Sequence, residues 1–196
     1  MAIHTRIILS TIVLLNFALI VSASPSCSKN ELDQSRFIWY SCGTAGNTNK
    51  WYGVSLISDT LDAAKSACDE VSNSYKTELL WIGDQNVDIC AYYALKLYAG
   101  GKDYSVVSSL QKFGYTVWQW CPGNSNIEME VCVDPHPMGY TNWGIGEPRD
   151  GQYCMEVHVE KGAKSFGDYS WKTKDCGELM YSQNRFMCVV DCDDKG

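Results

Sequence analysis

Residues 143–148 read Trp-Gly-Ile-Gly-Glu-Pro, and the chain then runs through Cys154, Trp171 and Cys176 to a closing Phe-Met-Cys at Cys188. This stretch holds three of the ten cysteines, and all ten lie after residue 23. An even number of cysteines in a secreted chain predicts five disulfides formed in an oxidising compartment. Ten cysteines allow about 945 pairings, so their spacing alone does not select one.

The order of these residues resembles the signature half of a C-type lectin-like domain. In that family a Trp-x-x-Gly-Glu-Pro loop presents calcium ligands and sugar contacts, a Trp-Asn-Asp strand supplies more ligands, and a closing Phe-x-Cys ties the ends. The resemblance runs from about Cys27 to Cys188, with its specific motifs after Tyr140. It implies a disulfide-rich α+β fold, with two helices packed on mixed, mostly antiparallel strands and a long irregular loop region from about Cys121 to Trp171.

The resemblance also implies disulfide pairings. It pairs Cys68 with Cys188 and Cys154 with Cys176, and the long form of the family carries an amino-terminal bridge that would join Cys27 to Cys42. Of the four cysteines left, Cys121 and Cys132 would close one loop locally, which leaves Cys90 for Cys192. The alternative pairing of Cys90 with Cys121 stays open.

Helices and strands are also predicted before the signature stretch. Residues 27–54 read as a hairpin-like extension with two aromatic clusters. Asp59 is placed to cap a first helix, and a second helix begins after Asp84 and ends at Gly100. Residues 78–82 and 117–120 read as strands. Residues 102–114 match no part of the family pattern and are interpreted as an insertion or a lengthened connection.

The first residues predict export from the cell. Residues 1–6 carry a positive charge, residues 7–21 are almost wholly apolar, and small residues follow at 21–23, as in a secretory signal peptide. A single-pass anchor is the alternative, but the apolar run is about fifteen residues and a bilayer needs about twenty. We expect residues 24–196 to form a single secreted domain. No second apolar run approaches spanning length, so we expect no membrane insertion.

The net charge of the chain bears on which classes of molecule it is expected to bind. The net charge is −7, and loss of Arg6 with the signal peptide changes it to −8. Because the mature chain has no run of Lys or Arg, nucleic acid is not an expected partner. The chain has no Asn-x-Ser/Thr sequon, so no N-linked glycan is expected.

The family's calcium ligands are largely replaced. Of five ligand positions implied by the resemblance, only Glu147 keeps its carboxylate. Arg149 replaces the third residue of the triplet, Gln152 stands at the position of an acid, and Lys172 and Thr173 replace Asn and Asp. An ammonium about 5 Å from a divalent cation repels it by about 6 kcal/mol at an effective dielectric near 20. The sequence therefore predicts no calcium, no other metal and no cofactor at this loop. The family's habit makes Pro148 a candidate cis proline.

The same substitutions have two interpretations. Glu147, Arg149, Asp150 and Lys172 form a mixed-charge surface that would hold acidic or sulfated sugars directly. Alternatively, Arg149 and Lys172 only neutralise nearby carboxylates, as surface charges usually do. Trp143 and Trp171 occupy framework positions and are predicted to be core residues. Three tyrosines suit either a ligand face or the core: Tyr140, Tyr153 and Tyr169.

Catalysis is not expected. The two histidines after residue 23 are His136, between prolines, and His158, in an alternating strand. Both are interpreted as satisfied surface residues, and no Ser-His-Asp arrangement, zinc spacing or phosphate loop is recognised in the sequence.

The predicted function is extracellular recognition of a glycan or pathogen surface without calcium. The candidate ligand-binding residues are Tyr140, Glu147, Arg149, Asp150, Gln152, Tyr153, Tyr169, Lys172 and Thr173. A protein-binding module that uses the same loops is the alternative, and a structural matrix component is a third reading. Fold does not fix function, and the sequence does not indicate an oligomeric state.

Overall fold

The computed structural model describes residues 26–43, 49–114, 117–122, 125–126, 131–132, 135–181 and 183–195. The predicted signal peptide, residues 1–23, lies outside this part. The helices are η1 (Lys29–Glu31), α1 (Leu61–Asp69), α2 (Gln85–Ala99), η2 (Phe166–Asp168) and α3 (Cys176–Tyr181). The strands are β1 (Phe37–Ser41), β2 (Lys50–Ser55), β3 (Lys76–Leu79), β4 (Tyr104–Phe113), β5 (Val117–Trp120), β6 (Ser125–Asn126), β7 (Val131–Cys132), β8 (His136–Pro137), β9 (Cys154–Val159), β10 (Tyr169–Lys174) and β11 (Met187–Asp191).

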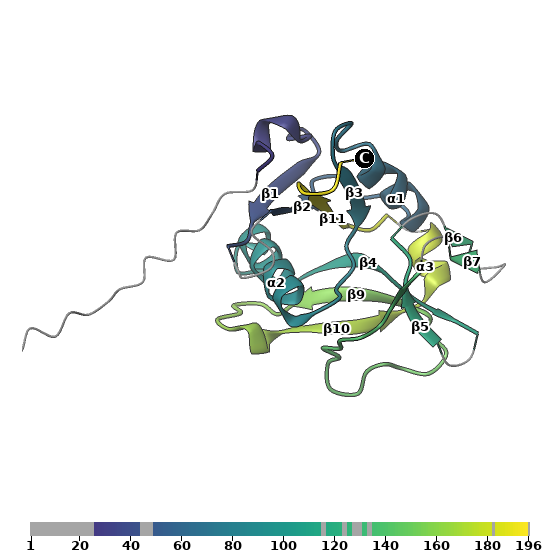
Figure 1. Ribbon diagram of the computed structural model, residues 1–196. Helices are drawn as coiled ribbons and strands as arrows, with labels where there is room; N and C mark the ends of the chain where they lie inside the picture. Colours follow the sequence, from purple (N-terminus) through teal and green to yellow (C-terminus); the bar gives the residue numbers. More distant parts are fainter. Residues whose placement is uncertain are drawn as a thin grey trace, which may run out of the picture.

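Two antiparallel sheets carry the core. The first has the strand order β1-β2-β11-β3 and the second has the order β10-β9-β4-β5-β8. Figure 1 shows α2 between the two sheets and α1 beside the first. One cluster of buried side chains lies around α2 and includes Leu95, Trp120 and Trp171, and the other lies around α1 and includes Leu61 and Phe186. This is the predicted α+β class.

The helix ends follow the sequence closely. The N-cap of α2 is Asp84, whose carboxylate accepts hydrogen bonds from the backbone N–H groups of Asn86 and Val87. The helix ends at Gly100, which has the left-handed conformation (φ 56°, ψ 34°) that glycine adopts without strain. The N-cap of α1 is Thr60 rather than the predicted Asp59. A third short helix, α3, was not predicted.

Residues 102–114 are not an insertion. They contain β4, a ten-residue strand that lies between β9 and β5 at the middle of the second sheet. Its serines break the apolar pattern that would have identified a buried strand. The hydroxyls of Ser108 and Ser109 are buried and donate to the carbonyls of Met155 and Leu80, at 3.1 and 2.9 Å. Because backbone carbonyls satisfy these hydroxyls, a polar sequence is tolerated inside the core.

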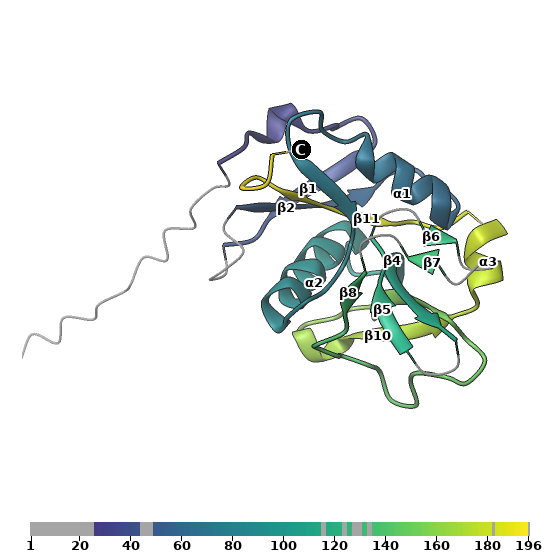
Figure 2. The same ribbon diagram turned by 45° about the vertical axis from the view of Figure 1, so that its right-hand side comes forward.

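The irregular region is also shorter than the predicted range of about 121–171. It is interrupted by β8, which pairs with β5, and by β9, which lies between β10 and β4. What remains in one piece is the segment from Met138 to Tyr153, which Figure 2 shows as a long excursion below the second sheet.

Three predicted disulfides are confirmed: Cys68–Cys188, Cys154–Cys176 and Cys121–Cys132. The pairings Cys27–Cys42 and Cys90–Cys192 are wrong, and so is the alternative of Cys90 with Cys121. The structure has Cys27–Cys192 and Cys42–Cys90.

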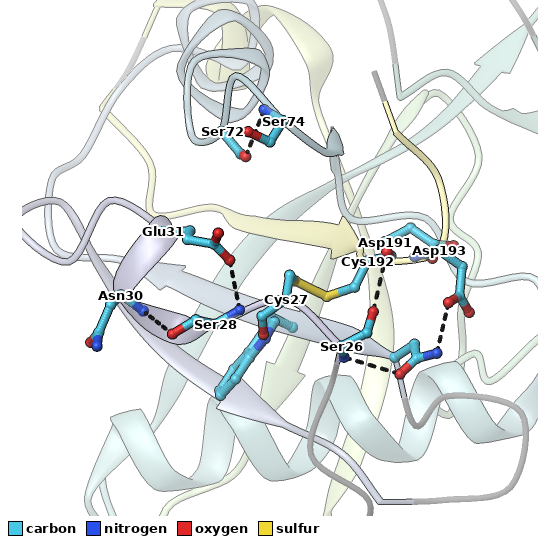
Figure 3. Close-up of a disulfide and its surroundings, with 12 residues drawn as sticks. Ser26, Cys27, Ser28, Asn30, Glu31, Ser72, Ser74, Asp191, Cys192 and Asp193 are labelled. Carbon is cyan, nitrogen blue, oxygen red and sulfur yellow. Dashed lines mark hydrogen bonds between the residues drawn. A yellow bond between two sulfur atoms is a disulfide. The ribbon is translucent and has the colours of Figure 1, made fainter.

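The corrected pairings follow from the path of the chain. Strand β11 pairs with β2, so the residues after it return to the start of the domain. Figure 3 shows Cys192 bonded to Cys27, with the hydroxyl of Ser26 donating to the Cys192 carbonyl at 3.4 Å. Cys42 follows β1, which packs on α2, and Cys90 is a fully buried residue of that helix. Sequence spacing alone does not show that Cys192 comes close to Cys27 or that Cys42 comes close to Cys90.

We predict that Cys90→Ser leaves a free thiol at Cys42 and none at Cys192. The bridge from Cys42 to Cys90 closes a loop of 48 residues, and losing it destabilises the native state by about 4 kcal/mol in the chain-entropy model. Alkylation of the unreduced variant, followed by peptide mapping, locates the thiol, and urea unfolding measures the stability. Alkylation at Cys192 would contradict the pairing.

Candidate functional site

The loop that carries the Trp-Gly-Ile-Gly-Glu-Pro motif lies against the edge of β10. The backbone N–H of Trp171 donates to the carbonyl of Asn142 at 2.9 Å, and the N–H of Gly144 donates to the carbonyl of Trp171 at 3.0 Å. These bonds form a parallel bridge between Trp143 and Trp171. The loop is therefore anchored to the sheet by its own backbone.

Glu147 points into the protein, and both of its carboxylate oxygens have protein partners. One oxygen accepts hydrogen bonds from the N–H of Thr173, at 3.0 Å, and from the Thr173 hydroxyl. The other lies 3.0 Å from Nε of Arg149. The side chain of Glu147 is only 3% exposed, whereas that of Arg149 is 65% exposed. The peptide bond from Glu147 to Pro148 is cis, as predicted.

This arrangement does not fit a calcium ion. Calcium binds six to eight oxygens, several of them carboxylates, and the one carboxylate kept from the family's set is already bonded to Thr173 and Arg149. Among the residues that the structure describes, no three His, Cys, Asp or Glu side chains are grouped closely enough to hold a metal ion.

Beside the loop lies a cleft of about 410 Å³. One wall is the loop itself, and the other is the segment from Glu160 to Lys172. The cleft combines two cations, Arg149 and Lys172, with two carboxylates, Glu147 and Glu160. It is lined by Asn142, Trp143, Gly144, Ile145, Glu147, Arg149, Glu160, Phe166, Gly167, Tyr169, Ser170 and Lys172.

The cleft brings together four of the nine predicted site residues: Glu147, Arg149, Tyr169 and Lys172. Asp150 is exposed and does not line it. Thr173 is buried beneath the loop. Gln152 and Tyr153 lie further along, where the Lys112 ammonium sits 5.8 Å from the centre of the Tyr153 ring. The sequence did not single out Glu160 and Phe166, which complete the opposite wall.

A buried carboxylate that the sequence analysis missed lies under the cleft. Asp88 is a residue of α2 with no exposed surface. Its Oδ1 accepts hydrogen bonds from the Tyr169 hydroxyl at 2.8 Å and from Trp171 Nε1 at 2.9 Å. Its Oδ2 accepts from Asn142 Nδ2 at 2.9 Å and from the Tyr140 hydroxyl at 3.2 Å. One carboxylate thus joins the helix, the loop and β10.

These bonds decide the roles of the aromatic residues. Tyr169 is 3% exposed and Trp171 is fully buried, so both are core residues, and their polar atoms donate hydrogen bonds to Asp88. Trp143 is half-buried, packs on Trp171 and still lines the cleft. Tyr140 is half-buried and its hydroxyl points inward to Asp88. The prediction of a core role holds fully for Trp171 and in part for Trp143.

Burial also raises the pKa values of Asp88, Tyr140 and Tyr169. Desolvation raises the pKa of Asp88 to about 6, although its four hydrogen bonds oppose the shift. Burial and the neighbouring Asp88 raise the pKa of Tyr140 and of Tyr169, so both phenols keep their protons. Both tyrosines are therefore uncharged neighbours of Asp88 at physiological pH.

The histidines differ from the prediction of two surface residues. His158 is 8% exposed, its Nε2 lies 3.1 Å from Asp103 and its Nδ1 lies 2.8 Å from the hydroxyl of Ser105. Folding thus connects Ser105 and Asp103 through the two ring nitrogens of His158, which the sequence did not suggest. The Ser105 hydroxyl also lies 3.2 Å from the Glu156 carboxylate. The ring of His136 stacks on Trp81, with 4.5 Å between ring centres.

We predict that Thr173→Val destabilises the protein by about 1–3 kcal/mol, because it leaves the buried Glu147 carboxylate and the Arg149 N–H each without one partner. Thr173→Ser keeps the hydroxyl and is the matched control, with an expected loss below about 1 kcal/mol. Urea unfolding measures both. Equal stability of the two variants would show that the hydroxyl is not needed.

Comparison with models of protein families gives no match, and comparison with curated proteins gives none either. Solved structures do match. Human lithostathine is 21% identical with a TM-score of 0.52, and the match covers 85% of this chain and 91% of that one. The C-type lectin domain of murine dendritic cell inhibitory receptor 2, solved in complex with an N-glycan, is 15% identical with a TM-score of 0.51, covering 85% and 99%.

A third structure, CEL-IV, is 15% identical with a TM-score of 0.52, and the match covers 84% of this chain and 94% of that one. At these identities the likeness concerns the fold. It agrees with the motif order read from the sequence, the two sheets around α2 and the bridges Cys68–Cys188 and Cys154–Cys176. The chain therefore has the C-type lectin-like fold.

Proposed function

We propose that this protein is a secreted recognition module that binds an acidic or sulfated glycan in the cleft beside the loop, without calcium. The observation that carries the proposal is the state of the two cations. Within the described part of the chain, the Lys172 ammonium makes no hydrogen bond or ion pair, and the Arg149 guanidinium uses only Nε, on Glu147. The Lys172 ammonium and the two terminal nitrogens of Arg149 are therefore free to bind an anion.

The rest of the cleft suits a sugar. Glu160 is exposed and offers acceptors for sugar hydroxyls. Trp143 and Phe166 supply apolar surface for the face of a ring. Glu147, which is bonded to Arg149 at one oxygen, fixes the direction of the guanidinium, and a pre-oriented guanidinium loses less entropy on binding. A sulfate or carboxylate is the expected anchor, because guanidinium groups bind such anions with paired hydrogen bonds.

The extracellular part of the proposal rests on the sequence and on the disulfides. Residues 1–23 have the pattern of a signal peptide, and residues 24–196 are proposed to be a single secreted domain. Five disulfides suit an oxidising compartment. No helix in the described ranges is both long and apolar enough to cross a bilayer. We propose binding rather than catalysis as the activity.

A protein partner is the second candidate, and one residue favours it. Ile145 stands at the rim of the cleft and is fully exposed. An exposed apolar side chain next to a polar cleft is a common feature of protein interfaces. In that case the same loop would bind a protein surface.

We predict that the double variant Arg149→Ala/Lys172→Ala binds an immobilised sulfated glycan at least about tenfold more weakly, because charge-assisted hydrogen bonds contribute about 1.5–3 kcal/mol each. The wild-type protein should bind equally well with calcium and with a chelator, and less well in high salt. Surface plasmon resonance measures all three effects.

The matched control is Lys29→Ala/Lys195→Ala, which removes the same charge from two exposed positions that do not line the cleft. It should leave the affinity within about twofold, since distant exposed charges are screened. Loss of binding in the chelator would contradict the proposed calcium-free site. Equal binding by the double variant and the wild type would remove the two cations from it.

A further inference from the structure

The cleft and Asp88 share two residues. Asn142 and Tyr169 both line the cleft, and both donate hydrogen bonds to the Asp88 carboxylate behind it. Asn142 belongs to the loop wall, and Tyr169, the first residue of β10, belongs to the opposite wall. Through Asn142 and Tyr140 the carboxylate also attaches the loop to α2. One buried side chain is therefore bonded to both walls, in addition to the backbone hydrogen bonds that join the loop to β10.

We propose that Asp88 is the positioning residue of the cleft, and that its protonation state controls how firmly the loop from Tyr140 to Arg149 docks and hence how well the cleft binds. The proposal rests on the proposed function for its ligand. The part of the proposal that concerns docking of the loop does not depend on a ligand.

Few charged groups face Asp88. On its own helix the nearest titratable residues are Asp84, one turn earlier, and Tyr92, one turn later. The loop contributes Tyr140 and β10 contributes Tyr169, and both remain protonated. Of the strands packed on α2, β2 brings Tyr52, which lies near Asp84, and β1 brings Tyr40. Strand β4 brings Tyr104, whose ring contacts Tyr98 of α2, and β9 brings Glu156 and His158, which are hydrogen-bonded to Ser105. Among the described residues, no lysine or arginine forms an ion pair with Asp88. The Asp88 carboxyl is therefore the group in this cluster that changes charge near neutral pH.

The sign of the effect follows from linkage. With the loop docked, burial holds the pKa of Asp88 at about 6, above its ordinary value of 3.8. Lifting the loop admits water, so the pKa falls toward the ordinary value. A group whose pKa is higher in the docked state favours docking when it is protonated. Docking is strongest below about pH 4 and weakens as the pH rises through about 6, and the docking equilibrium should change about tenfold between pH 5 and pH 7.

Protonation is compatible with the geometry because Tyr140 can adapt. A protonated Oδ2 donates to the Tyr140 oxygen once that hydroxyl rotates, and Tyr140 is half-buried, so its own proton can point to water. Oδ1 keeps both of its buried donors, Tyr169 and Trp171. The loop therefore stays attached when the charge is removed, and the cost of burying a charge disappears.

The first test uses the free protein. Nuclear magnetic resonance follows the indole N–H of Trp171, which donates directly to Asp88, from pH 4 to pH 8. We expect an inflection near pH 6, and about tenfold stronger protection of the Gly144 and Trp171 amides from hydrogen exchange at pH 5 than at pH 7, after correction for intrinsic rates. The proposal would be overturned if neither the Trp171 indole resonance nor the exchange protection of the two amides changed with pH. This test needs only the wild-type protein and no ligand.

The second test uses variants and a sulfated disaccharide, whose charge does not change in this range. The wild type should bind more tightly at pH 5 than at pH 7, and Asp88→Asn, which cannot ionise, should show no such difference and no inflection. The control is Asp62→Asn, which removes a carboxylate from the first turn of α1 and should keep the wild-type profile. A wild-type profile in Asp88→Asn would overturn the proposal. A disaccharide that binds at no pH would instead refute the proposed function, while the Trp171 titration still decides on Asp88.

Discussion

The carboxylate of Asp88 is the contact on which the described site depends. It is fully buried, and it accepts four hydrogen bonds from the loop and from β10. An isolated buried charge is costly, whereas one that accepts several hydrogen bonds is tolerated. While the carboxylate is ionised, the four donors offset the cost of its burial, and the same hydrogen bonds link the loop, the strand and the helix. Two of these donors, Asn142 and Tyr169, also line the cleft, on opposite walls.

A second carboxylate explains why the loop keeps its shape without a metal. Glu147 accepts hydrogen bonds from Thr173 and pairs with Arg149. The resemblance read from the sequence would place calcium ligands at these two positions. Thr173 therefore acts as an internal partner of Glu147, and Arg149 both neutralises the carboxylate and extends into the cleft. The two interpretations of the basic substitutions are thus compatible, because Arg149 pairs with Glu147 through Nε, and its terminal nitrogens have no partner among the described residues.

The sequence predicted those parts of the fold that local patterns encode. Caps and apolar spacing located α2, and the Glu-Pro motif located both the loop and its cis bond. The polar sequence of β4 concealed a central strand, since its serines are satisfied by the carbonyls of Met155 and Leu80, which are distant in the sequence. The two wrong disulfides have the same origin, because Cys27 meets Cys192 only when β11 returns beside β2.

The candidate site was predictable only in part for a similar reason. Glu147, Arg149 and Lys172 lie in a motif and were found, whereas Glu160 and Phe166 lie outside any motif. Asp88 gave no signal because it sits among the apolar residues of a helix, and a single acid in such a position reads as a solvent-facing residue. Its four donors come from positions 52 to 83 residues further along the chain.

The central claim is that the protein's own side chains, and not a cation, hold this loop. The most direct measurement is a crystal structure determined after soaking in millimolar calcium. The account predicts the Thr173 and Arg149 contacts of Glu147 unchanged, with no ion beside that carboxylate. A calcium ion coordinated by Glu147, with Arg149 displaced from it, would contradict the account.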